Sequence, residues 1–203
     1  MRPAAVSSKA RQSGRTREAL LSHSLRLVAS RGFSRTSIDH IGRAAGVTKG
    51  AMYWHFASKD ELFLAILDRI RERWQHVVHA PVSARQTPTE RLVQLFESYG
   101  ELFRGSPDIC LFLQQALLDQ HNRKYSAQVA RVFAKTARFI AGIIDEGKKA
   151  GEIRRKVDSM TVAHMILGML AGASQQASTA RTQPLNKLLS EARAMTLAYL
   201  RQA

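Results

Sequence analysis

The residues best suited to chemistry lie between Thr36 and Lys59, where hydrogen-bond donors recur around a short turn. An apolar-periodic run ends at Gly46, and glycine ends a helix at positive φ with the least strain. Thr48 follows, and its hydroxyl predicts an N-cap at which a second short helix begins. One side of that helix is apolar through Met52 and Phe56, whereas the other carries donors. The pattern predicts two short helices around a tight turn, with one face packed and the other free.

Two helices joined by such a turn can place the second helix in the major groove of DNA. Lys49 can donate to guanine O6 and N7 or to a phosphate, and Gly50 lets the backbone approach closely. Tyr53 and His55 can donate to phosphates one turn further on. Lys59 lies near another helix N-terminus, where unpaired N–H groups and the helix dipole favour an anion. The alternative on these residues alone is a helical hairpin with a solvated polar face.

The charge of the chain agrees with a polyanionic partner. The formal net charge is +15, and residues 1–60 hold eleven Lys or Arg against Glu18, Asp39 and Asp60. We expect residues 1–14 to form a disordered basic arm. Together with Arg15 and Arg17, this arm can follow the DNA backbone or enter the minor groove. A generally basic surface is the other explanation of the charge.

Helical periodicity dominates the chain and strand alternation is almost absent, so we predict an all-α protein of about nine helices. The first helix is expected to start at Thr16, and a helix-turn-helix domain of three helices to span residues 15–57. A capping box at Ser58 opens a connecting helix over 58–79. A Pro-, Ser- and Thr-containing loop should then separate it from a larger helical domain over 80–203.

Aromatic and amide side chains of the second domain suit an apolar ligand pocket with a few polar groups. The alternative is ordinary helix core. The candidate pocket residues are Phe96, Tyr99, Phe103, Phe112, Gln115 and Phe133.

The last two helices suit pairing with a second copy of the chain, because two glycines four residues apart permit close helix approach and a long apolar stripe follows. Packing of the same surfaces within one chain is the alternative. The candidate dimer residues are Met165, Gly168, Gly172, Leu188, Ala192, Met195 and Tyr199.

Several classes of protein find no support in the sequence. Cys110 is the single cysteine and cannot form an internal disulfide. His76 and His79 have the spacing of a metal pair but no further ligand beside them, so no metal is expected. No phosphate loop, nucleophile elbow or metalloprotease motif occurs, so neither a cofactor nor enzymatic activity is expected. No stretch has the apolar length of a signal peptide core or a membrane span, which predicts a cytoplasmic protein.

The stretch GFSRTSIDHIGRAAGVTKGAMYWHFASKDELF resembles the signature segment of the TetR family of bacterial transcriptional regulators, and VTKGAMYWHFASKDELF is similar to its AcrR-type multidrug-efflux repressors. The resemblance covers residues 17–67. It implies a three-helix DNA-binding domain and a larger helical domain that binds a ligand and dimerises. It places Lys49 and Gly50 near bases, and Trp54 at a phosphate or in local packing. The residues that it places at phosphates are Thr36, Ser37, Thr48, Tyr53, His55 and Lys59.

Three residues depart from the family pattern. His23 and Ser24 stand where the family usually has small alanines, and Gly42 replaces an alanine inside the first helix of the motif. A helix-interior glycine costs up to ~1 kcal/mol relative to alanine.

The sequence thus predicts a homodimeric repressor that binds a palindromic double-stranded DNA operator. The resemblance suggests an efflux or detoxification operon, and a small apolar or amphipathic inducer that releases the DNA. Three alternatives stay open: a regulator of the same fold that lacks an inducer or acts as an activator, a non-specific basic nucleic-acid-binding protein, and a helical enzyme. Similar affinity for random and operator DNA would distinguish the non-specific binder.

Overall fold

A computed structural model describes residues 8–119, 122–180 and 183–201. Within those residues the protein is helical and has no strand, and one isolated bridge pairs Ile153 with Arg201. The described helices form nine continuous segments, because α4, η1 and α5 run on without a break, as do α9 and η2. This confirms the predicted fold class. The elements are α1 Ser8–Arg31, α2 Ile38–Ala44, α3 Lys49–His55, α4 Lys59–Trp74, η1 Gln75–His79, α5 Ala80–Ser83, α6 Pro88–Gly105, α7 Asp108–Leu118, α8 Arg123–Ala150, α9 Ser159–Gln175, η2 Gln176–Ala180 and α10 Leu185–Leu200.

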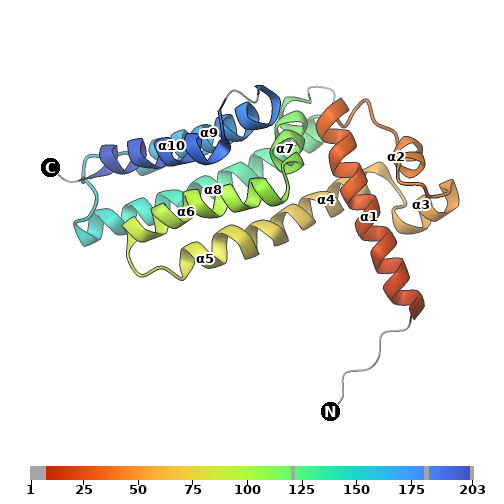
Figure 1. Cartoon of the computed structure of the whole chain (residues 1–203), viewed down its shortest axis with the longest axis horizontal. Helices are drawn as coiled ribbons and strands as arrows, with labels where there is room; N and C mark the ends of the chain where they lie inside the picture. The colour runs from red at the N-terminus through yellow and green to blue at the C-terminus, as the bar shows by residue number, and fades with distance from the viewer. Residues whose placement is uncertain (1–7, 120–121, 181–182, 202–203) are drawn as a thin grey trace, which may run out of the picture.

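Helices α1, α2 and α3 form a small bundle at one end of the molecule (Figure 1). Each helix contributes one apolar face to a shared core, in which Val28, Ile41, Met52 and Phe56 are fully buried. Burying an aliphatic or aromatic side chain of this size contributes about 1.5–3 kcal/mol. This core fixes α3 against α2 and leaves the other face of α3 open.

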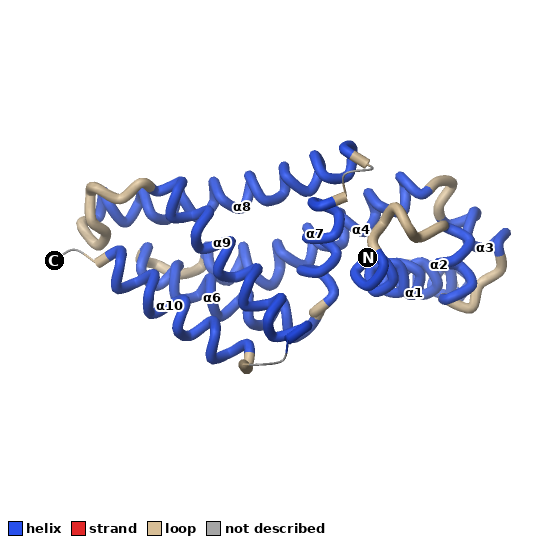
Figure 2. The backbone as a smooth tube through the Cα atoms, turned by 90° about the horizontal axis from the view of Figure 1, so that it is seen from above, coloured by secondary structure: helices blue, strands red, loops and turns tan. Residues whose placement is uncertain are grey.

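Helices α6, α8, α9 and α10 run lengthwise through the rest of the molecule, and α4 with α5 lies along one side (Figures 1 and 2). Helix α8 packs against α6, α7 and α9, whereas α10 packs against α6 and α9. The short helix α7 also packs on α1. The small bundle is therefore attached to the larger one by α7 as well as by α4.

Four buried aromatic rings fill the junction between the two groups of helices. Phe63 of α4 stacks on Tyr125 of α8, with 4.2 Å between ring centroids, and meets Phe33 edge-on at 5.0 Å. Phe112 of α7 lies on the other side of Phe63, at 5.7 Å. Aromatic pairs of this kind contribute about 0.5–1.5 kcal/mol beyond their buried area. The start of α8 is thereby held against the start of α4.

Helix α1 begins earlier than the sequence suggested. We expected a disordered arm over residues 1–14, but the helix already starts at Ser8, so residues 8–14 are helical. Lys, Ala, Arg and Gln at 9–12 are strong helix formers. This extension shows no apolar stripe, so the helical periodicity of the sequence did not reveal it. Residues 1–7 lie outside the described part of the chain.

The connecting helix also continues further than predicted. The loop expected after His79 is helical up to Ser83, although Pro81 lies inside that stretch. A proline lacks the N–H group of an α-helix and its ring clashes with the carbonyl four residues earlier. Here the preceding turn is π-helical, and the N–H of Ala80 donates to the carbonyl of Gln75, five residues back. The wider turn accommodates the proline, so the loop shrinks to residues 84–87.

Several helix ends are set by glycines or by capping side chains. The glycines that end α1, the turn after α2 and α8 all have positive φ. Thr87 forms the full capping box with Glu90, and the Asp158 side chain accepts from the N–H of Thr161. Ser58 caps α4 by accepting from Glu61 N, but the Glu61 carboxylate accepts from Ala57 N instead of closing the box at Ser58.

Candidate DNA-binding and ligand sites

The two short helices are capped by hydroxyl groups on the same edge of the bundle. Ser37 Oγ accepts from His40 N at 3.1 Å, and Thr48 Oγ1 accepts from Ala51 N at 3.2 Å. Gly46 between the helices has φ of 70°, as the turn requires. A hydroxyl that accepts a cap bond still carries its own proton. Ser37 and Thr48 can therefore hold the helix ends and donate to a phosphate at once.

Helix α3 presents its polar side outward. Met52 is buried beneath it, while the exposed fractions are 42% for Tyr53 and 72% for Trp54. A Cβ added at Gly50 would meet no atom within 4 Å, so the helix start is open to a close approach. The Trp54 ring meets the His55 ring edge-on at 4.7 Å. Trp54 thus lies on the surface and not in the core.

Lys49, the residue expected near bases, is held by an acid in the free protein. Its Nζ lies 3.1 Å from Asp39 Oδ2, and both side chains are exposed. The hydrogen bond to Asp39, followed by the charge of that carboxylate, raises the pKa of Lys49. Exposed ion pairs of this kind contribute little to stability, because solvent screens the two charges. Lys49 can therefore leave Asp39 for DNA at little cost.

A shallow hollow of about 420 Å³ brings several predicted phosphate ligands together. Ser37, Tyr53 and Lys59 line it, although they come from three different helices or their caps. Arg35 and Ser34 line it too, and the sequence reasoning did not select either of them. Arg35 is exposed and its guanidinium suits a phosphate. Its position just before the α2 cap was the available signal.

Thr36 lines the same hollow but cannot serve through its side chain. The residue is fully buried, and its hydroxyl donates to the carbonyl of Gly32 at 2.8 Å. The phosphate role expected for the Thr36 side chain is therefore corrected to a structural one. This bond closes the turn after α1, which sets the position of Ser37 at the start of α2.

The environments of Lys59 and His55 shift their proton affinities. The ammonium group of Lys59 lies 4.6 Å from the centre of the Phe33 ring, and burial lowers the pKa of this lysine while the Asp119 carboxylate opposes the shift. Burial, and then the charge of Arg17, lower the pKa of His55 from its usual 6.5. His55 is therefore neutral at pH 7, where an imidazole still donates one N–H.

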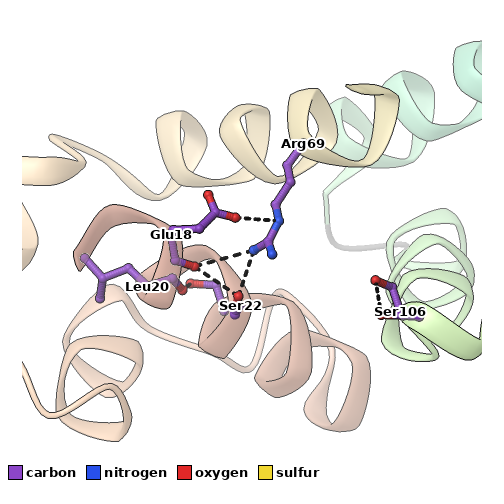
Figure 3. Close-up of polar contacts among 7 residues, drawn as sticks. Glu18, Leu20, Ser22, Arg69 and Ser106 are labelled. Carbon is purple, nitrogen blue, oxygen red and sulfur yellow. Dashed lines mark hydrogen bonds and ion pairs between the residues drawn. The ribbon is translucent and has the colours of Figure 1, made fainter. Parts of the chain in front are cut away.

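Helix α4 is tied to the small bundle by Arg69 (Figure 3). Arg69 Nε lies 2.9 Å from Glu18 Oε1, and its Nη1 donates to Ser22 Oγ at 2.9 Å. Both partners belong to α1, so a displacement of α4 at this level carries α1 with it.

The first turn of α4 is also tied to the first turn of α8. The Asp60 carboxylate accepts from the Tyr125 hydroxyl and pairs with Lys124 at 2.5 Å. The bond from Lys124, followed by that from Tyr125, lowers the pKa of Asp60. Asp119, at the end of α7, accepts from the backbone N–H and the hydroxyl of Ser34, which lies one turn before α2. We call these contacts of Asp60 and Asp119 the interdomain latch.

A large pocket of about 560 Å³ lies among α4, η1, α6, α7, α8 and α9. This volume is within the ~300–1,000 Å³ of small-molecule sites. Trp74, Phe139 and Tyr99 contribute aromatic walls, and Trp74 Nε1 donates to Tyr99 Oη at 3.4 Å. Burial raises the pKa of Tyr99 to about 12, so its hydroxyl stays protonated. The His79 ring lies 4.8 Å from that of Phe139 and closes one end.

Three of the six residues expected in a pocket line the cavity, and the other three do not. Tyr99, Phe103 and Phe133 do line the cavity. Phe96 and Phe112 are core residues instead, exposed by 2% and 0%, and Gln115 is exposed on α7 away from the cavity. The sequence could not tell which face of each helix turns inward. It also missed the contribution of the connecting helix, from which Trp74 lines the cavity.

Comparison with known proteins identifies the family. The family described as "Bacterial regulatory proteins, tetR family" matches residues 20–66, and "Tetracyclin repressor-like, C-terminal domain" matches residues 88–195. The chain belongs to the TetR family. It is accordingly a DNA-binding transcription regulator and not an enzyme.

Relatives within the TetR family differ in how much of the chain they match. The transcriptional regulator AcrR of Shigella flexneri is 51% identical over 51 residues, which cover 25% of this chain and 24% of AcrR. The fatty acid metabolism regulator of Bacillus subtilis is 20% identical over 151 residues, covering 74% and 77% of the two chains. Among solved structures, FadR from Bacillus subtilis in complex with stearoyl-CoA has a TM-score of 0.75 at 17% identity and covers 91% of this chain and 99% of that one.

The outer sides of α9 and α10 carry most of the residues expected at a dimer interface. Met165, Met195 and Tyr199 are exposed by 61%, 65% and 54%. A Cβ added at Gly168 or Gly172 would meet no atom within 4 Å, so both glycines face away from this TetR-family protomer.

The remaining two dimer candidates face partly or wholly inward. Leu188 is half-buried, whereas Ala192 is only 8% exposed and packs inside the protomer. The side chain of Ala192 is therefore not available to a second copy, contrary to the expectation for this residue. No helix among the described residues of this TetR-family chain has the length and hydropathy to cross a membrane.

Proposed function

We propose that this TetR-family protein is a homodimeric repressor that holds a palindromic operator and releases it when a small apolar or amphipathic molecule occupies the pocket beside α4. One observation supports this most directly. The Asp60 contacts of the interdomain latch join α4 to α8 at one end, and the same two helices line the pocket further along, so one pair of helices serves both sites.

On DNA, α3 enters the major groove with Lys49 and Gly50 nearest the bases. Tyr53 and His55 donate to phosphates on the flank of the helix. The hollow beside Ser37 takes a further phosphate, together with Arg35 and Lys59. The phosphates supply affinity, and Lys49 supplies base preference. Thr48 and Trp54 are exposed as well.

The dimer proposed here uses the outer sides of α9 and α10, which two copies would join as a four-helix bundle. Met165, Met195 and Tyr199 supply apolar area, and the bare faces at Gly168 and Gly172 let the partner helices approach closely. Two-fold symmetry then presents two copies of α3 to successive major grooves, about 34 Å apart.

Release follows from the geometry of α4. A ligand between α4 and α8 moves the two helices relative to each other, and the ties of Arg69 to α1 carry that motion into the small bundle. The spacing between the two copies of α3 then no longer matches the operator. For this the ligand must bind the released state more tightly, because equal affinity for both states shifts nothing.

The regulated genes in this proposal belong to an efflux or detoxification operon. The 51% identity to AcrR over 51 residues supports it, together with the resemblance of residues 47–63 to AcrR-type repressors. The longer match to a fatty acid metabolism regulator supports a different operon with the same mechanism. The pocket is compatible with either, since both call for a molecule with a large apolar part.

Selection of binding sites from random DNA tests the proposal. The expected product is an inverted repeat with half-sites one helical turn apart, or a multiple of it, and the genes beside its genomic copies name the pathway. Enrichment of no sequence would contradict specific recognition and favour a non-specific basic binder. The control is Tyr53→Phe, which should weaken binding to every sequence equally, whereas Lys49→Ala should relax base preference.

A further inference from the structure

The charges on the pocket between α4 and α8 are one-sided. Arg71, Arg131 and Lys135 reach its lining, against a single carboxylate, that of Asp68. Asp68 already pairs with Arg71, one turn further along α4. Within the described residues no ion pair joins Arg131 or Lys135 to an acid. Two cations of α8 therefore face the pocket without a carboxylate beside them.

Arg131 and Lys135 are four residues apart, so they lie on the same face of α8. Like charges at that spacing repel each other and weaken the helix. Both side chains are exposed, which places them where the pocket opens to solvent. An anion between them would offset the repulsion and accept hydrogen bonds from both groups.

The inner part of the pocket has a different character. The Trp74 and Phe139 rings meet edge-on at 5.6 Å, and Tyr99 lies 5.6 Å from Phe103. Leu170 below them is almost fully buried. The polar groups at this depth already have partners, since Tyr99 Oη accepts from Trp74 and the Thr136 hydroxyl donates to the Val132 carbonyl. This region suits an apolar tail or ring.

We propose that the pocket takes an amphiphile with a carboxylate or another anionic head group, held between Arg131 and Lys135, with its apolar part against Trp74 and Phe139. The inference rests on the proposed function, because it names the ligand class of that same pocket. It excludes cationic amphiphiles as preferred ligands, since their head group would meet two unpaired cations and one carboxylate that already has a partner.

Three single-tailed probes of equal chain length test the head group: dodecanoate, 1-dodecanol and dodecyltrimethylammonium. Emission from Trp74 reports binding in a Trp54→Phe background, because the chain has two tryptophans and Trp54 is exposed. A hydrogen bond to a charged group is worth enough to change affinity by tenfold or more, so dodecanoate should bind about tenfold more tightly than the cationic probe.

The double variant Arg131→Gln/Lys135→Gln should weaken dodecanoate binding about tenfold and leave the dodecanol affinity unchanged. Both side chains are exposed, so the change leaves the core intact. Arg138→Gln is the matched control, because Arg138 is a cation on the same helix that does not line the pocket. It should leave all three affinities unchanged.

Two results would overturn the inference. Equal affinity for all three probes would show a pocket for amphiphiles without selection for an anion, and would leave the proposed function standing. If the protein still selects an operator but binds none of the three probes, the pocket is not a site for amphiphiles, and the preference for an anionic head group falls with it. The DNA selection described above separates this second result from a failure of DNA recognition.

Discussion

Gly42→Ala should stabilise the DNA-binding bundle, although Gly42 is buried beneath the recognition helix. An added Cβ would lie 3.4 Å from Met52 Cβ and 3.7 Å from Val47 Cγ2, which are ordinary van der Waals distances. The change removes a helix-interior glycine, worth up to ~1 kcal/mol, and buries a methyl group, worth about 0.8 kcal/mol. We expect the free energy of unfolding to rise by about 1–2 kcal/mol. The upper end of this range applies if the added methyl group causes no strain at Met52.

Thermal unfolding followed by circular dichroism measures this gain. For a chain of this length, 1 kcal/mol shifts Tm by about 2–4 °C if the whole chain unfolds together. Gly46→Ala is the matched control, because φ of 70° at Gly46 costs an alanine about 1–2 kcal/mol. The two variants should therefore shift Tm in opposite directions. If the Gly42→Ala protein melts as early as the Gly46→Ala protein, the expected gain in stability is wrong, since the space beside Met52 would then be absent.

Three further predictions concern DNA binding and the latch. Asp39→Asn releases Lys49 and removes a carboxylate from the DNA face, so filter-binding assays should show tighter binding to unrelated DNA. The slope of the logarithm of affinity against the logarithm of salt concentration should become steeper by about 0.9, and an unchanged slope would contradict this. Because the pKa of His55 is lowered, operator affinity should be flat above pH 7 and rise as the pH falls below 6.5, and His55→Gln should abolish that rise. Asp60 has a lowered pKa in the folded protein, so its contribution to stability is present above its ordinary pKa of 3.8 and lost as the pH falls below it. Asp60→Asn should therefore lower Tm at neutral pH and leave it unchanged at pH values well below 3.8, and a Tm difference that persists in acid would exclude the latch as its source.

The DNA-binding segment could be predicted from the sequence because its determinants are local. Gly46, Thr48 and Ser58 act on backbone groups within four residues, so their types alone define where the short helices begin and end. The buried face of α3 follows equally from spacing, as Met52 and Phe56 show. Thr36 was assigned wrongly because its hydroxyl is used by a turn whose closure the sequence does not reveal.

The pocket could not be predicted to the same extent because it depends on how distant helices face one another. Trp74, Tyr99 and Phe139 come from three segments far apart in the chain and meet only after packing. Aromatic residues at helical spacing look alike in sequence whether they line a cavity or fill the core. Phe112 illustrates this, since it was expected in the pocket and is instead one of the four aromatic rings at the junction between the two groups of helices.

The most direct test of the account compares the affinity of the protein for its selected operator with that for a scrambled duplex of the same length and composition, at one salt concentration. If α3 reads base edges, the ratio of the two affinities should be about a thousandfold or more, and Lys49→Ala should reduce it. Equal affinities, with a steep dependence on salt, would contradict it and leave only a basic surface that binds any DNA.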